Sequence, residues 1–323
     1  MLIGSSPCFR RCVGLLTRYA AFDAPVLIHG ETGTGKELAA RHVHYASARR
    51  DRAFVPVNCG AIPDTLVESE LFGHSRGAFT DAKTAQAGLI ELAAGGTLFL
   101  DEVDSLSARA QVALLRFLQD FEYRPVGSCA ARTANVRVLA ATNAPLDALI
   151  ERGAFRRDLL YRLNALEVWI PALRQRAEDV PLLATHFLER AGRLLRGGVR
   201  RFTDDALALL AAYPWPGNIR ELENLALRAA ALVDAEEIDV DGLVVAEPAF
   251  AAVRAGPRLL ARVEVYSVAK GLAMHAFERG YLEDLMRRVD GNVSRAARLA
   301  GTERRQLGRL LKKHGLGRLP TLN

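Results

Sequence analysis

Short apolar runs alternate with helical patterns through the first half of the chain. Runs rich in branched and aromatic residues predict five strands, at 25–28, 54–57, 97–100, 136–140 and 166–170. Helical patterns fill the intervals, and Pro56 favours a sheet edge or a strand end for the second strand. Strands that alternate with helices indicate a parallel sheet with helices on both faces, which is an α/β fold.

The second half of the chain is helical in pattern. From Glu178 to about Val245 the spacing is wholly helical, with one break at 213–217. Residues 246–262 contain Pro, Gly and many alanines and are typical of a linker. We therefore expect four parts, namely an α/β core over 1–172, a helical subdomain over 173–245, a linker over 246–262 and a helical C-terminal domain over 263–323.

Composition excludes several classes of protein. Half of the 323 residues are hydrophobic and a quarter are charged, as in globular domains. No apolar run reaches the roughly 18 residues that a membrane helix needs, and arginines interrupt the N-terminal region where a signal peptide would be apolar. The four cysteines lack the paired spacing of zinc ligands, which predicts reduced thiols and a cytoplasmic protein without a membrane partner.

The positive charge is concentrated at one end. Residues 254–323 hold 15 Lys and Arg against 6 Asp and Glu, a formal charge of +9, whereas residues 1–253 carry −3. A slightly acidic body with a basic tail predicts a nucleic-acid-binding domain at the C-terminus. The alternative is an ordinary solvated basic face.

A glycine-rich segment lies between the first strand and the next helix. It fits G-x-x-x-x-G-K, and its members are Gly30, Glu31, Thr32, Gly33, Thr34, Gly35 and Lys36. In this position the loop amides surround phosphates, the helix N-terminus favours an anion, and the lysine reaches the outer phosphates. Glu37 stands where the general pattern has Ser or Thr, so the usual magnesium hydroxyl is missing.

The third strand ends in two carboxylates, Asp101 and Glu102. Beside a phosphate loop, Asp101 is expected to hold Mg²⁺ and Glu102 to polarise the attacking water. The alternative is a strand followed by an acidic helix cap at Asp101 or Asp104. Together with the phosphate loop, the pair predicts an ATPase.

At this point the residues resemble a known family. Residues 68–82 read ESELFGHSRGAFTDA, close to the ESELFGH and GAFTGA segments of the AAA+ ATPase domain in bacterial enhancer-binding proteins, the NtrC-type activators of sigma-54 RNA polymerase. In that family Glu is the norm at the position of Glu37. The resemblance runs from about Leu2 to Val245 and resumes in the C-terminal domain. It identifies 173–245 as the helical lid and ATP with Mg²⁺ as the cofactors.

The resemblance implies further contacts with the nucleotide. Ile3 and Gly4 match the segment that borders the adenine. Thr142 and Asn143 match the sensor that reads the γ-phosphate. Arg220 matches the second sensor, on the lid, although by itself it could simply pair with a neighbouring glutamate.

The resemblance also implies catalysis between subunits. Arg156 and Arg162 match arginine fingers, which neutralise charge on the γ-phosphate and act in a ring, expected to be a hexamer. Asn58 matches a residue that restrains the catalytic glutamate. From the residues alone, the two arginines are open to interpretation as surface side chains, and Asn58 as a turn residue.

Phe79 and Thr80 match the loop that contacts sigma-54 in the family. The chain departs from the pattern at Asp81, where the family has Gly. Asp adopts positive φ better than most residues, but it adds a negative charge. Two readings follow: the loop still acts on sigma-54, or the chain keeps the ATPase and loses that contact.

The C-terminal sequence predicts a helix-turn-helix. A helix over 281–289 precedes a short one over 293–300 with Ser294 as its cap, Gly301 forms the turn, and a basic helix runs over 302–313. It resembles the Fis-type domain, which dimerises on DNA. Base contacts are expected from the start of the last helix, and phosphate contacts from the remaining basic residues. These candidates are, in that order, Arg304, Arg305, Gln306 and Arg309, then Arg295, Lys312 and Lys313.

Together these features predict an ATP-hydrolysing activator that binds enhancer DNA and remodels the closed complex of sigma-54 RNA polymerase holoenzyme. Because the ATPase starts at the N-terminus, we expect no receiver domain there, and control by a separate regulatory protein, by expression level or by ring assembly. The alternative is a DNA-binding regulator that uses ATP only for assembly. A helicase or general AAA+ remodeller would leave the 68–82 segment and the Fis-type end unexplained.

Overall fold

The computed structural model describes residues 2–79, 82–195, 200–250, 282, 285–286, 289, 292–302 and 304–313. The chain divides into one compact unit over Met1–Phe250 and a second over Ala251–Asn323. Most of the expected linker, 251–262, lies outside the described residues. Among the described helices, none is long and apolar enough to cross a membrane.

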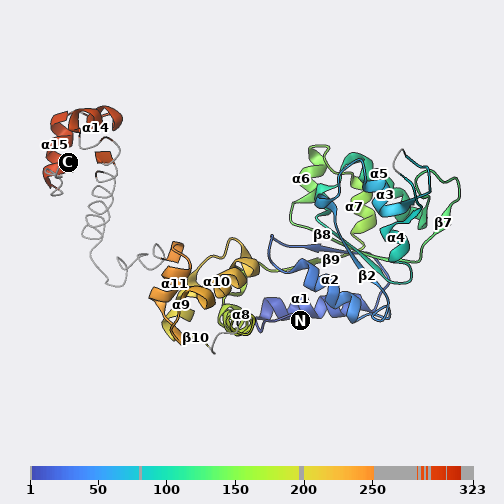
Figure 1. Ribbon diagram of the computed structural model, residues 1–323, viewed down its shortest axis with the longest axis horizontal. Coiled ribbons are helices and arrows are strands. Elements are labelled where there is room, and N and C mark those ends of the chain that lie inside the picture. Colours follow the sequence, from blue (N-terminus) through green and yellow to red (C-terminus); the bar gives the residue numbers. More distant parts are fainter. Residues whose placement is uncertain are drawn as a thin grey trace. The chain divides into compact units, whose positions relative to one another are not determined.

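Five parallel strands form the central sheet of the first unit (Figure 1). They lie in the order β2-β5-β8-β1-β9, and all neighbours pair in parallel. Their bounds are Val26–His29 for β1, Phe54–Asn58 for β2, Thr97–Asp101 for β5, Arg137–Thr142 for β8 and Leu166–Trp169 for β9. The five predicted strands and the edge position of β2 are confirmed. Because β1, β5 and β8 are almost wholly buried, they read as continuous apolar runs.

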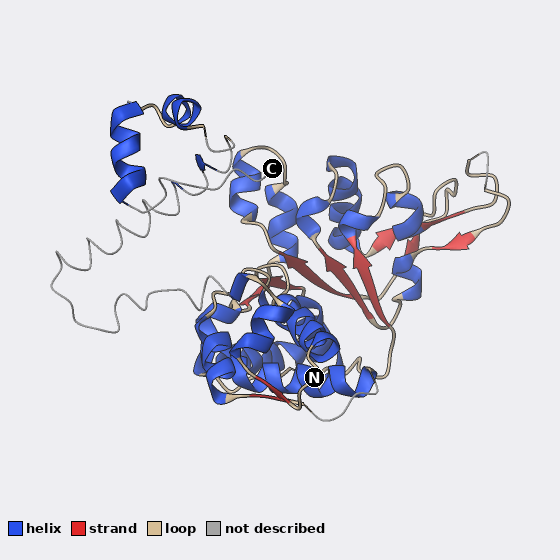
Figure 2. Cartoon of the chain, turned by 60° about the vertical axis from the view of Figure 1, so that its left-hand side comes forward, coloured by secondary structure: helices blue, strands red, loops and turns tan. Residues whose placement is uncertain are grey.

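Helices cover both faces of this sheet (Figure 2). On one face, α1 (Pro7–Ala20) and α2 (Lys36–Tyr45) bury Leu16 and Val43 against strand residues such as Ile28. On the other, α5 (Ala108–Asp120), α7 (Arg157–Leu163) and neighbouring short helices form the larger core cluster. This two-sided covering confirms the predicted α/β fold and makes the sheet a rigid support for the loops at its ends.

Short elements fill the connections of the core. They are the 3₁₀ helices η1 (Cys59–Ala61) and η2 (Val103–Ser105), the helices α3 (Val67–Phe72), α4 (Leu89–Leu92) and α6 (Leu146–Glu151), and the paired strands β3 (Gly73–His74) with β4 (Gln86–Ala87) and β6 (Glu122–Tyr123) with β7 (Arg132–Thr133). The β3–β4 pair closes the base of the segment that contains Phe79, and η2 directly follows the acidic end of β5.

The lid follows the sheet. It comprises η3 (Leu173–Asp179), α8 (Val180–Leu194), α9 (Asp204–Ala212), α10 (Asn218–Leu232) and α11 (Val240–Ala246) around its own core cluster. The prediction of a wholly helical segment is wrong in one detail, because β10 (Arg201–Phe202) pairs in parallel with β11 (Glu237–Ile238) and bridges the helix connections. The buried Phe250 packs on Tyr213 and Trp215, so lid packing continues beyond the expected boundary at Val245.

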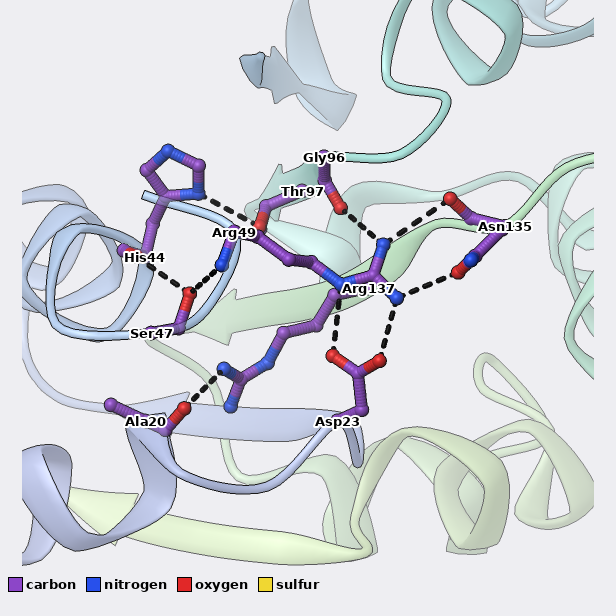
Figure 3. A network of polar contacts seen from close by, with 9 residues as sticks. All are labelled: Ala20, Asp23, His44, Ser47, Arg49, Gly96, Thr97, Asn135 and Arg137. Atoms are coloured by element: carbon purple, nitrogen blue, oxygen red, sulfur yellow. Dashed lines mark hydrogen bonds and ion pairs between the residues drawn. The ribbon is translucent and has the colours of Figure 1, made fainter. Parts of the chain in front are cut away.

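A polar network holds the amino end of the sheet (Figure 3). Arg49, after α2, donates to both carboxylate oxygens of Asp23, to the carbonyl of Gly96 and to the side chain of Asn135. The buried Arg137 of β8 donates to the carbonyl of Ala20 at the end of α1. These bonds join α1, α2, β5 and β8 at the end opposite the phosphate loop, so the connections there are tied to the same rigid sheet.

In the second unit, α14 (Val293–Leu299) and α15 (Arg304–Lys313) pack around Leu282, Ala296 and Leu307. Gly301 between them has φ +61°, as a tight turn requires. The prediction of Ser294 as the cap is wrong: the side chain of Asn292 accepts a 3.1 Å hydrogen bond from the backbone N–H of Arg295 and caps α14 instead. Ser294 lies inside the first turn, where it has no cap position to fill.

Candidate nucleotide and DNA sites

The phosphate loop joins β1 to α2 as the sequence predicted. Gly33 and Gly35 have φ of +79° and +95°, and a Cβ on Gly33 would lie 2.4 Å from the carbonyl oxygen of Gly217. Lys36 begins α2, is mostly buried, and donates from Nζ to the carbonyls of Gly30 and Glu31 at 2.9 and 3.2 Å. The glycines therefore shape a tight loop whose lysine points back along it.

The carboxylates of Asp101 and Glu102 lie near Lys36 at the carboxyl end of the sheet. Burial raises the pKa of Asp101, although the positive charge of Lys36 opposes that rise. Burial likewise lowers the pKa of Lys36, and the charges of Asp101, Asp104 and Glu102 oppose that change. The three expected residues Lys36, Asp101 and Glu102 are thus brought within electrostatic range of one another, in the arrangement that a bound phosphate and cation require.

Glu102 has a strained backbone, with φ +54° and ψ +48° in the left-handed region. A non-glycine residue held there is uncommon and marks functional sites. Its Oε2 lies 3.0 Å from where a Cβ on Gly60 would stand. Asn58 pairs in register with Asp101, and its Oδ1 accepts a 2.8 Å bond from the N–H of Gly60. The carboxylate of Glu102 therefore lies beside the turn that Asn58 caps, although none of the described hydrogen bonds joins the two side chains.

The two expected sensor residues at the end of β8 differ in their surroundings. Thr142 is buried, donates to Oδ1 of Asp104 at 2.6 Å and accepts from the N–H of Ala144. Asn143 is exposed, and its Nδ2 donates to Oγ1 of Thr32 in the phosphate loop at 3.0 Å. The Thr142 hydroxyl thus supports the turn, while the Asn143 amide lies beside the loop.

A cavity of about 340 Å³ opens between the phosphate loop and the lid. Ile3, Thr34, Ile170 and Ile219 are among its mostly apolar lining residues, which suits a planar base. Ile3, predicted to border the adenine, lies in the wall of this cavity. Gly4 lies beside it, with φ +158°, where a Cβ would meet the ring of Phe9.

Sequence reasoning missed the residues that hold this segment. Oδ1 of Asp179 accepts from the backbone N–H groups of Ser5 and Ser6, and Oδ2 accepts from the Ser6 hydroxyl. Arg176 lines the cavity and is buried, with its guanidinium 4.3 Å above the ring of Phe9. Burial lowers the pKa of Arg176. Residues 174–179 are mostly charged or polar, so no local pattern distinguished these two residues from their neighbours.

Arg220 lies on the exposed side of the first turn of α10, with its Cβ 3.2 Å from the Cβ position of Gly33. Arg156 and Arg162 lie elsewhere, at the exposed start and end of α7. Arg156 is paired with Asp158 by two bonds of 3.0 and 2.7 Å. Within the described residues, no hydrogen bond or ion pair joins Arg156 or Arg162 to the phosphate loop.

The 73–88 segment projects from the paired strands β3 and β4. The ring of Phe79 is 42% exposed and lies 4.9 Å from the ring of His74, which supports it from β3. Thr80, predicted to contact sigma-54, and Asp81, predicted to depart from the family pattern, lie outside the described residues. The described part of the segment thus presents one aromatic ring partly to solvent.

The second unit presents its polar candidates to solvent. Arg295 on α14 and Arg304, Gln306 and Arg309 on α15 are exposed, opposite the buried Leu307. The hydroxyl of Thr302 donates to Oε1 of Gln306 at 3.2 Å, which orients that amide. The side chains of Arg305, Lys312 and Lys313 lie outside the described residues. Basic side chains along one face of the second of two short helices form a surface suited to a DNA groove.

Three family models match successive parts of the chain. Residues 2–169 match the sigma-54 interaction domain, residues 174–247 match the AAA+ ATPase lid domain, and residues 273–314 match the bacterial regulatory proteins of the Fis family. The first match spans the phosphate loop, the acidic strand end and the 73–88 segment. The second spans the lid and the third spans α14 and α15.

Relatives agree with these matches. The phenol regulator MopR of Acinetobacter guillouiae is 44% identical over 98% of this chain and 56% of its own length. The transcriptional regulatory protein GlrR of Escherichia coli is 41% identical over 98% of this chain and 68% of its own. This chain thus spans between about half and two thirds of the lengths of these relatives.

A solved structure shares the fold. The crystal structure of NtrX from Brucella abortus in complex with ATP has a TM-score of 0.73 and 32% identity, and the match covers 98% of this chain and 70% of that chain. The expected family, fold and Fis-type domain are confirmed. The chain therefore belongs to the sigma-54-dependent transcriptional regulators, with their AAA+ ATPase domain, its lid and a Fis-type DNA-binding domain.

Proposed function

We propose that this protein binds enhancer DNA upstream of a promoter, assembles into a ring and uses ATP hydrolysis to remodel the closed complex of sigma-54 RNA polymerase holoenzyme. The observation that carries the proposal is the placement of Lys36, Asp101 and Glu102 at one end of the sheet, in a chain whose 73–88 segment exposes Phe79. The family membership supports sigma-54 RNA polymerase as the partner, and the site supports ATP hydrolysis as the source of energy.

The loop and its surroundings fit ATP with Mg²⁺. The Gly33–Gly35 loop and the mostly buried Lys36 suit the phosphates, and the cavity beside Ile3 suits the base. In such sites Mg²⁺ is held by one or two carboxylates together with substrate phosphates, so the carboxylate of Asp101 suffices as the protein ligand. A larger set of ligands is not needed, and the described residues contain no cluster of three or more metal-binding side chains. The bound cation neutralises phosphate charge. Glu102 orients and polarises the attacking water, and Asn58 restrains Glu102 through the 58–60 turn, which lies beside the Glu102 carboxylate.

Ring assembly completes the site. Arg156 and Arg162 are exposed on α7, and a neighbouring subunit's nucleotide is the anion we assign to them. An arginine finger contributes roughly 10³–10⁵ in rate. Arg156 would leave Asp158 to bind that phosphate. The free energy lost is small, because an exposed ion pair is weak. A ring, as a hexamer, supplies one such finger to each site.

Phe79 and Thr80 are assigned to sigma-54 contact. The ring of Phe79 is supported by His74 and is 42% exposed, as a side chain that meets a partner should be. The Fis-type unit is assigned to enhancer DNA as a dimer, with Arg304, Gln306 and Arg309 toward bases and Arg295 toward phosphates. These partners place the protein in the cytoplasm, with a separate regulatory protein as a source of control.

A transcription assay with purified components tests the proposal. The full chain, sigma-54 holoenzyme and a promoter with an upstream site should yield transcripts with ATP and none with a non-hydrolysable analogue. Thr80→Ala should hydrolyse ATP and yield no open complexes, whereas Lys36→Ala should lose both activities. If the wild type hydrolyses ATP, binds DNA and still opens no complex, the alternative of a regulator that uses ATP for assembly replaces this proposal.

A further inference from the structure

The side chain of Glu31 lies in the phosphate loop without a role in binding phosphates. The pattern G-x-x-x-x-G-K places no requirement on its second residue, and a carboxylate near phosphates is repelled by them. Its surroundings account for it. Arg174 Nη1 donates to Oε2 at 2.7 Å and Nη2 donates to Oε1 at 2.5 Å, which forms a bidentate pair. The bonds to Arg174 and Asn218 lower the pKa of Glu31 to about 2.

Both partners of Glu31 belong to the lid. Arg174 lies in η3, where the chain leaves the sheet, and Asn218 begins α10, the helix that carries Arg220. Asn218 is fully buried with φ +53°, and its Nδ2 donates to Oε2 of Glu31 and to the carbonyl of Thr32 at 3.2 and 3.1 Å. Its Oδ1 accepts from the N–H of Leu173 at 2.8 Å. Asn218 therefore joins the phosphate loop to both lid segments.

The backbone completes this connection. The N–H of Ile219 donates to the carbonyl of Gly33 at 3.0 Å. The carbonyl oxygen of Gly217 occupies the space that a Cβ on Gly33 would need, so this close approach of lid and loop requires glycine at position 33. Any rotation of the lid must therefore move the phosphate loop or break these bonds. Neither carboxylate nor guanidinium is deeply buried, at 44% and 47% exposure, so the pair adds little to global stability and is free to open and close.

We propose that Glu31 and Arg174 are positioning residues that couple the lid to the phosphate loop and thereby hold Arg220 over the nucleotide. The proposal rests on the proposed ATP hydrolysis and extends it. With the pair intact, Arg220 and Lys36 keep a fixed separation during hydrolysis. With the pair broken, the bonds of Asn218 and Ile219 hold the lid less tightly, and Arg220 leaves more often the position in which it meets the γ-phosphate.

The test uses Glu31→Gln, Arg174→Gln and the double variant of the full chain. Each single change should lower kcat about tenfold, as small displacements of catalytic groups do, with a much smaller change in KM. The double variant should be no slower than the slower single variant, because both remove the same coupling. Arg174→Lys keeps one charged donor and should recover part of kcat.

A second readout follows nucleotide release with a fluorescent ATP analogue in stopped flow. Both Gln variants should release it about two- to fivefold faster, the factor expected for an exposed ion pair. Arg201 and Glu237 provide the control, a more exposed ion pair that lies wholly within the lid, so Arg201→Gln should change neither readout. Thermal unfolding of all variants should stay near that of the wild type.

The outcomes separate the two proposals. A wild type that releases nucleotide slowly and does not hydrolyse it refutes the proposed function, while the release rates still test the coupling. A hydrolysing wild type with unchanged kcat and release in Glu31→Gln overturns the coupling alone. Additive losses in the double variant also overturn it, because the two side chains would then act separately.

Discussion

The hydroxyl of Thr142 donates a 2.6 Å hydrogen bond to Oδ1 of Asp104. This bond joins the end of β8 to η2, the turn that follows the acidic end of β5. The next residue, Asn143, contacts Thr32 of the phosphate loop. Asp104 thus supports the turn that carries the two proposed sensor residues, although by sequence it was only an alternative helix cap.

Asp104→Ala should lower kcat for ATP hydrolysis about tenfold, because the 142–144 turn loses its anchor and Asn143 is displaced. ATP affinity should change little, since the loop and Lys36 are untouched. Steady-state ATPase assays and binding titrations measure both. Asp104→Asn should retain most activity, because its carbonyl oxygen accepts the same bond. A normal kcat in Asp104→Ala would show that the anchor is unnecessary.

Lys36→Ala and Asp101→Ala should separate binding from hydrolysis. The lysine is the mostly buried cation of the loop, so its loss should abolish ATP binding. Asp101 is assigned to Mg²⁺, so its loss should abolish hydrolysis while the fluorescent analogue still binds. Titration and phosphate-release assays distinguish the two. Hydrolysis at the wild-type rate in Asp101→Ala would contradict the assignment.

The cysteines should differ in reactivity toward iodoacetamide. Burial raises the pKa of Cys59 to about 12 and that of Cys12 to about 11, whereas Cys129 is exposed. Because the thiolate is the reactive form and exists only near or above the pKa, Cys59 and Cys12 should stay protonated and unlabelled from pH 7 to 9. Mass spectrometry should find Cys129 labelled before either. Rapid labelling of Cys59 at pH 8 in the folded chain would contradict its burial.

Two changes in the C-terminal unit should affect DNA binding differently. Arg304→Ala should cost about 1–3 kcal/mol at the specific site and relax discrimination at one base position. Lys312→Ala should weaken binding to all sequences and flatten the salt dependence by about one counterion. Fluorescence anisotropy with specific and random duplexes at several salt concentrations measures both. Undiminished discrimination in Arg304→Ala would remove it from the base contacts.

Asn292→Ala should destabilise the C-terminal unit by about 1 kcal/mol, because the N–H of Arg295 loses its acceptor. Ser294→Ala is the matched control and should be nearly neutral, since Ser294 lies within α14 and Asn292 occupies the cap position. Denaturant unfolding followed by helical circular dichroism compares the two. A larger loss of unfolding free energy in Ser294→Ala than in Asn292→Ala would support Ser294 as the cap, as the sequence predicted.

Local sequence was enough to predict the strands, the position of the phosphate loop and the residue types at the end of the sheet. Local patterns suffice for these features, because buried parallel strands are continuous apolar runs and a phosphate loop needs glycines at fixed spacing beside a lysine. The basic helix over 302–313 was predicted for the same reason, and α15 covers Arg304–Lys313.

Which distant residues contact one another is visible in the folded chain alone. Asn218 reads as the first residue of a helix, yet it bonds to Glu31 and Thr32, nearly 190 positions earlier. Asp179 holds Ser5 and Ser6 across a similar separation. Such contacts follow from how the lid packs on the sheet, and no periodicity records them because each partner fits its own local element equally well without the other.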